Sequence, residues 1–140
     1  MADVIYNSFK KQLLNAGINF GTSSVKIMLV TSTYTPDQDT HDFKDDVTNE
    51  VSGTGYTTGG ATLANGTVTQ DNTDDEAVYD ADDVTWGTSS LTARGAVLYQ
   101  DTGVGSTSPL IAYLDFGSDQ TSSSGNFTIQ WNTEGIINLG

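Results

Sequence analysis

The sequence predicts a mainly β fold, either an antiparallel β-sandwich or a jelly-roll-like barrel, with one short N-terminal α-helix. The chain has 140 residues, which fits a single domain spanning 1–140. Glycine, serine, threonine, asparagine and aspartate are abundant, and this composition suits many short strands joined by tight turns. The second half contains short apolar or alternating runs separated by turn residues. The connections between them are too short for parallel crossovers.

The first element is an amphipathic helix predicted over residues 3–16. Asp3 is a suitable N-cap, and Gly17 lies where a glycine ends many helices. An apolar stripe runs along one side of the helix and consists of Ile5, Phe9 and Leu13. We expect this stripe to pack on the domain's own sheet; the alternative is docking on a partner subunit.

The second element is a strand over residues 25–31, the near-continuous apolar run VKIMLVT. Such a run predicts a central strand that is buried on both faces. Residues 32–46 are polar, contain Pro36 and several charged side chains, and predict an exposed loop. Residues 47–51 form a short strand or a turn.

The remaining elements are short strands. Asn65-Gly66 is the strongest two-residue hairpin signal in the chain, so we expect two strand pieces around it within residues 62–70. Turn-rich segments separate the further predicted strands, which span 76–79, 84–86, 91–99, 110–116, 126–132 and 135–139.

Charge limits the partners that the chain can have. Eighteen acidic residues oppose five basic ones, for a net charge of −13. Repulsion from a polyanion argues against nucleic acid and against an anionic membrane as partners. There is no cysteine, so disulfides and thiol chemistry are excluded. We expect neither a secretion signal nor a transmembrane segment, because no apolar run of suitable length is present.

Residues that could support chemistry lack the patterns that catalysis or metal binding requires. The single histidine, His41, lies in an acidic loop, and no serine stands in a nucleophile-elbow motif. The acidic turns contain no EF-hand loop and no fixed carboxylate pair, so a weak surface cation and a glycosidase pair remain minor alternatives to solvated acids. Residues 53–60 lack a phosphate-binding motif. We therefore expect no enzyme, no cofactor and no bound metal.

Arg94 is the only basic residue after position 44, and it lies within a predicted strand. We expect it to pair with Asp115 or Asp83, and either to tie neighbouring strands together or to contact a subunit. Together with the helix stripe and two loop aromatics it completes the set of candidate interface residues, which are Ile5, Phe9, Leu13, Tyr34, Phe43 and Arg94.

Several segments resemble a family of small virion structural proteins of tailed bacteriophages. They are VKIMLVTSTYTPDQDTHDF (25–43), SGTGYTTGGATL (52–63), DADDVTWGTSSLTARGAVLYQDTG (80–103), SPLIAYLDFG (108–117) and GNFTIQWNTEGIINL (125–139). The resemblance therefore covers nearly the whole chain. It implies a non-enzymatic component of the particle, most often a decoration or cement protein on the outside of the capsid.

The resemblance implies the partners and the location. The partners would be the major capsid protein and other copies of this chain, as a dimer or trimer, and the location would be the virion exterior after synthesis in the host cytoplasm. The alternative is a tail-associated adhesion module that binds a receptor or glycan. In that case the loop aromatics Tyr34, Phe43 and Tyr56 would stack on sugar rings.

Overall fold

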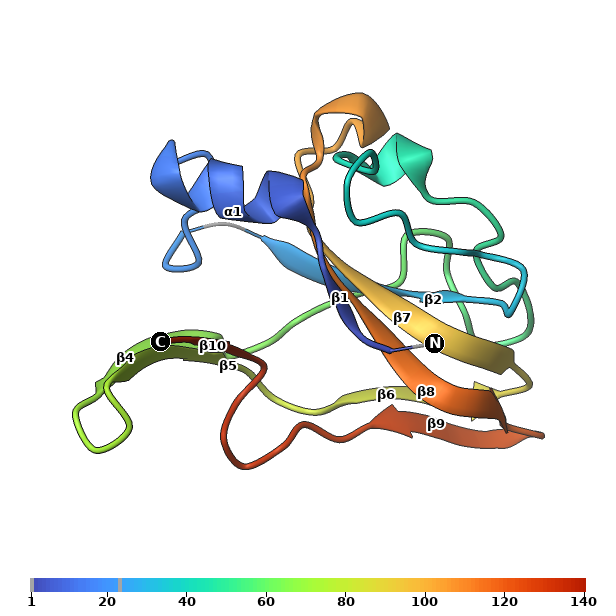
Figure 1. The fold of residues 1–140 in the computed structure, drawn as a ribbon. Coiled ribbons are helices and arrows are strands. Elements are labelled where there is room, and N and C mark those ends of the chain that lie inside the picture. The colour runs from blue at the N-terminus through green and yellow to red at the C-terminus, as the bar shows by residue number, and fades with distance from the viewer. Residues whose placement is uncertain (1, 23) are drawn as a thin grey trace.

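The largest sheet of the molecule has five antiparallel strands (Figure 1). A computed structural model describes residues 2–22 and 24–140 of the chain. The strand order in this sheet is β1 (Val4–Ile5), β8 (Leu110–Thr121), β7 (Thr92–Gln100), β2 (Val25–Val30) and β3 (Ala61–Thr62).

Two smaller antiparallel sheets complete the β structure of the described residues. One pairs β6 (Val84–Ser89) with β9 (Gly125–Ile129), and the other has the order β10 (Ile137–Leu139), β5 (Glu76–Asp80) and β4 (Thr67–Asp71). The helical elements are α1 (Asn7–Leu14) and two single turns, η1 (Lys44–Asp46) and η2 (Gly105–Thr107). The mainly β, antiparallel and sandwich-like fold with one helix near the N-terminus is thus as the sequence predicts.

The central strand β2 is buried on both faces, as its continuous apolar run predicts. Ile27 and Leu29 contribute to the main core, whereas Met28 and Val30 contribute to a second core cluster. All four side chains are at most 1% exposed. The five-stranded sheet therefore needs cover on both faces, which explains why an antiparallel strand here is apolar throughout.

The main core lies between the five-stranded sheet and the β6–β9 pair. Trp86 and Phe127 face it from β6 and β9 and meet edge to face, with ring centroids 6.1 Å apart. The second cluster, on the opposite face, has Tyr6, Tyr34, Tyr99 and Tyr113 among its buried members. Successive side chains of the central strands point into one cluster and then the other, and this alternation produces the layered, sandwich-like packing.

The chain changes sheets at two tight corners, from β6 to β7 and from β8 to β9. Leu91 and Ser122 exchange backbone hydrogen bonds of 3.2 and 2.9 Å there. The buried Ser89 hydroxyl lies 2.8 Å from the Ser122 hydroxyl and donates to the Trp86 carbonyl. These serines satisfy polar groups where the chain turns inside the protein, so consecutive strands can lie in different sheets.

The helix is shorter than predicted. Val4 and Ile5 pair with β8 as strand β1, and α1 begins at Asn7. Asp3 does not cap the helix; its Oδ1 accepts the backbone N–H of Asp115 at 2.7 Å. At the other end Ala16, not Gly17, adopts the left-handed conformation, with φ of 57°. Val4 and Ile5 form backbone pairs with the open edge of β8, so they are not part of the helix.

The Asn65-Gly66 hairpin is not formed. β3 pairs with β2 and β4 pairs with β5, so the segments on either side of Asn65 lie in different sheets. The hairpin of this region instead joins β4 to β5 through residues 72–75, where Asp75 has a φ of 57°. The predicted loop 32–46 is likewise not exposed throughout, because Tyr34 is buried.

Candidate functional site

α1 and the three-stranded sheet lie at one end of the molecule (Figure 1), and side chains from both line an apolar cleft. Its volume is about 140 Å³. Helix, loop and sheet all contribute side chains to its walls, which are formed by Phe9, Leu13, Phe20, Val68, Ala77, Val78, Tyr79, Ile137 and Leu139. No charged residue is among these nine, so the cleft suits an apolar occupant.

Aromatic rings form the inner wall of the cleft. Phe9 and Phe20 meet edge to face at a centroid separation of 5.9 Å, and Phe20 lies 4.4 Å from Tyr79. Phe9 and Tyr79 are only 2% and 6% exposed. These large, well-packed rings fix the shape of the cleft before any partner binds.

The rim of the cleft exposes large apolar side chains. Val68 on β4 is 56% exposed and Leu139 on β10 is 59% exposed. Single exposed apolar residues are ordinary, but two beside one hollow without charged lining residues form a patch, which is typical of an interaction surface. Lys10 and Lys11 on α1 are exposed at this end of the molecule, and the three-stranded sheet opposite them carries acids such as Asp71 and Glu76.

The structure brings together only part of the predicted helix stripe. Phe9 is buried and Leu13 is half-buried, and both line the cleft. Ile5 lies outside it, on β1, where it is 37% exposed. Phe9 and Leu13 therefore pack mainly on this domain, which is the first of the two arrangements expected from the sequence.

Tyr34 is not on the surface. Its side chain is 2% exposed, and its hydroxyl lies 2.8 Å from the Tyr6 hydroxyl and 2.9 Å from His41 Nδ1. Because Nδ1 also accepts the Asp37 backbone N–H, at 3.2 Å, it has no proton to give, and Tyr34 donates to it. Burial raises the pKa of both tyrosine hydroxyls. We name this group the Tyr6–Tyr34–His41 chain.

The other loop aromatics also turn inward and form no exposed stacking platform. Phe43 is half-buried and pairs with Pro109 in an isolated bridge. The Tyr56 hydroxyl donates to Glu50 Oε1 at 2.7 Å and accepts the Leu29 backbone N–H at 3.0 Å, and burial raises its pKa. These contacts hold the glycine-rich loop, residues 53–60, against β2.

Arg94 pairs with Asp115, as predicted, and thereby ties β7 to β8. The Arg94 Nε to Asp115 Oδ1 distance is 3.0 Å. This hydrogen bond, followed by one from the Gly117 backbone N–H, lowers the pKa of Asp115 to about 2. A role of Arg94 at a subunit contact stays a prediction.

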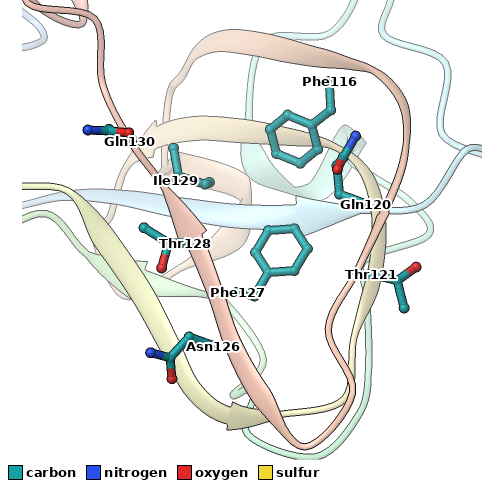
Figure 2. A pocket seen from close by; sticks show the side chains of 8 residues that line it. All are labelled: Phe116, Gln120, Thr121, Asn126, Phe127, Thr128, Ile129 and Gln130. Carbon is teal, nitrogen blue, oxygen red and sulfur yellow. The ribbon is translucent and has the colours of Figure 1, made fainter.

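A second hollow, the β8–β9 groove, opens where these two strands splay apart (Figure 2). Its volume is about 410 Å³. Phe116 and Phe127 point into it with ring centroids 6.2 Å apart. The lining contains no charged side chain and consists of Phe116, Gln120, Thr121, Asn126, Phe127, Thr128, Ile129 and Gln130.

The acidic clusters do not converge on a metal site in residues 2–22 and 24–140, where no group of three or more potential ligands was found. Asp46 instead accepts the backbone N–H groups of Asp42 and Phe43 at 2.9 and 3.2 Å, and the first of these bonds is the main reason its pKa is lowered. The acids thus act as turn-stabilising acceptors.

Comparisons with known proteins identify no relative. No family model matches the chain, and no curated protein or solved structure matches it either. Within the described part of the chain, no helix has the length and hydropathy needed to cross a membrane.

Sequence reasoning missed the sheet side of the cleft and the whole β8–β9 groove. Val68 lies between two threonines, and Leu139 alternates with Asn138 and Ile137; this alternation was a usable signal for one apolar face. No local signal indicates that β4 and β10 flank the same strand, because that depends on long-range pairing.

Proposed function

We propose that this chain is a non-enzymatic structural protein of a tailed-bacteriophage particle that decorates the outer surface of the capsid and stabilises the shell. The partner is the major capsid protein. The resemblance of residues 25–43, 52–63, 80–103, 108–117 and 125–139 to small virion proteins supplies the virion assignment, and the exposed apolar cleft supplies the means of attachment.

The observation that supports attachment most strongly is the apolar cleft, whose lining residues carry no charge, on a chain of net charge −13. Burying the exposed parts of Val68 and Leu139 is worth roughly 2–3.5 kcal/mol per copy, at about 1.5–3 kcal/mol for each fully buried side chain. A contact of that size is weak alone, but many copies on one shell stabilise it together by binding only the assembled form.

The charge distribution supports an outward location. An acidic surface keeps densely displayed copies soluble and is repelled by packaged DNA. The buried position of Tyr34 and the inward contacts of Phe43 and Tyr56 remove the specific feature that favoured glycan stacking. Capsid decoration is therefore the better supported of the two candidates.

Binding to undecorated shells tests the proposal. Expanded heads from the phage that encodes this chain, produced without it, are mixed with purified protein, and bound copies are counted after sedimentation. We expect saturable uptake by wild type and a loss of about tenfold or more in affinity for Val68→Asp, which places a charge in the apolar rim.

Val104→Asp is the matched control. Val104 is 55% exposed, close to the 56% of Val68, but it lies near η2, outside the cleft lining. The control should bind as wild type does. Equal loss in both variants, or no uptake of wild type, would rule out attachment through the cleft.

A further inference from the structure

The outer edge of β9 has no strand partner within residues 2–22 and 24–140, since β9 pairs with β6 alone. A row of unpaired backbone N–H and C=O groups is a template for another chain. Most natural edges are protected by brevity, charge, proline, a bulge or a covering loop. An edge that lacks all of these protections is a candidate site for pairing with another chain.

The other edges each have such a device. β1 and β3 are two residues long, β10 is three residues long, and β4 ends in Asp71. The loop at Thr54 bridges to Ser90, directly after β6, and the register shift between Trp86 and Ser89 places an extra residue on β6.

β9 has none of these protections. Its five residues, GNFTI, include no proline and no charged side chain, and the extra residue of its ladder is on β6. The surrounding stretch from Gln120 to Thr133 is also entirely uncharged, within a chain whose charged residues make up 16% of the sequence. The groove beside β9 exposes Phe116 and amide side chains in place of a covering element (Figure 2).

The absence of charge around β9 indicates which kind of chain could pair with its open edge. Two copies with a net charge of −13 each repel one another, so they can approach closely only where both surfaces are uncharged. An antiparallel strand edge is also self-complementary about a twofold axis, which is the commonest symmetry of homo-oligomers. The charge-free β9 edge meets both requirements.

We propose that two copies of this chain associate through antiparallel pairing of β9 with β9 of the second copy. The pairing joins the two β6–β9 sheets into one continuous four-stranded sheet, and side chains of one copy enter the β8–β9 groove of the other. The inference goes beyond the proposed function, because it concerns the free protein and needs no capsid.

Sedimentation equilibrium of the purified full chain tests the pairing, with Thr128→Asp as the disrupting variant. Thr128 is exposed in the middle of the edge, and the substitution places like charges on facing strands. We expect wild type to have twice the mass of one chain and Thr128→Asp to dissociate at least about tenfold more readily. A monomeric wild type at all concentrations tested overturns the proposal.

Three control variants separate edge pairing from other causes. Thr128→Ala removes the same hydroxyl contact with Thr85 without adding charge, and it should stay dimeric. Thr69→Asp adds the same charge at an exposed site on the β4 edge and should also stay dimeric. Val68→Asp tests the cleft instead; if it dissociates the dimer and Thr128→Asp does not, the dimer uses the cleft and the β9 proposal is wrong.

Salt dependence and crosslinking give independent readouts. Screening of like charges should tighten the dimer when NaCl rises from about 50 mM to about 500 mM.

The chain has no cysteine, so single cysteines placed at Asn126, Thr128 or Gln130 report on β9 directly. At least one should form a disulfide-linked dimer on oxidation, since facing residues of paired strands have suitable Cα separations. Crosslinking no greater than that of Thr69→Cys contradicts the pairing.

Discussion

The hydroxyl of Tyr34 is the polar centre of the second core cluster. It joins the buried Tyr6 hydroxyl, at 2.8 Å, to the half-buried His41 imidazole, at 2.9 Å. His41 in turn accepts the Asp37 N–H, so the Tyr6–Tyr34–His41 chain fixes the path of the loop that covers this face of the sheet. The lone histidine therefore has a structural role here that its acidic sequence neighbourhood conceals.

Tyr34→Phe should lower the free energy of unfolding by about 1–3 kcal/mol. The substitution keeps the ring but leaves the Tyr6 hydroxyl buried without this partner. Urea unfolding monitored by tyrosine and tryptophan fluorescence measures the change. Tyr113→Phe is the control from the same cluster, because its hydroxyl makes no hydrogen bond with the described residues; a loss as large as that of Tyr34→Phe would contradict the account.

The Arg94–Asp115 pair predicts a dependence of stability on pH. Asp115 has a pKa of about 2 in the folded protein, below the 3.8 of an unperturbed aspartate, because Arg94 and the Gly117 N–H stabilise its charged form. A depressed folded-state pKa contributes stability that is fully present above the unfolded value and is lost as the pH falls toward the folded value. The loss should therefore occur between about pH 4 and pH 2.

Comparison of wild type with Asp115→Asn isolates this contribution. The wild-type protein should be more stable at pH 7, and the difference between the two midpoints of urea unfolding should shrink as the pH falls from about 4 to about 2. A difference that stays constant over this range would show that the charge of Asp115 contributes nothing to folding.

At the scale of elements, most strands were predictable from their sequence patterns, and the errors lie at β1 and around Asn65-Gly66. β2 and β7 follow directly from their apolar runs. The apolar spacing of Ile5 with Phe9 fits a helix as well as a strand end, and only the open edge of β8 decides in favour of β1. The Asn65-Gly66 signal failed because the neighbouring segments found partners in two different sheets.

The glycine-rich loop before β3 provides a prediction at this scale. Gly60 has a φ of +82°, and a Cβ there would overlap the backbone carbonyl of Ile27 on β2. Gly60→Ala should therefore lower the free energy of unfolding both through its backbone conformation, at about 1–2 kcal/mol, and through this overlap, at about 2 kcal/mol or more.

Gly103→Ala separates the two costs. Gly103 has a nearly identical φ of +86°, yet a Cβ there would meet nothing within 4 Å. Denaturant unfolding of both variants should show a clearly larger loss for Gly60→Ala. Equal losses would mean that the close approach of the loop to β2 does not contribute to stability.

At the scale of the whole molecule, the candidate surfaces arise from segments far apart in sequence. The cleft combines α1 with β4, β5 and β10, and the β8–β9 groove exists because consecutive strands lie in different sheets. Composition predicted an acidic β domain, but it could not place the uncharged regions on the surface. Their positions follow from long-range pairing, which a single sequence does not specify.

Immunogold electron microscopy of intact virions, with antibody raised against this chain, tests the central claim most directly. The claim is that the chain decorates the capsid exterior and attaches through the apolar cleft. We expect gold distributed evenly over the head, and none on particles from a phage lacking the gene. Gold confined to the tail, or its absence from intact particles, would contradict capsid decoration.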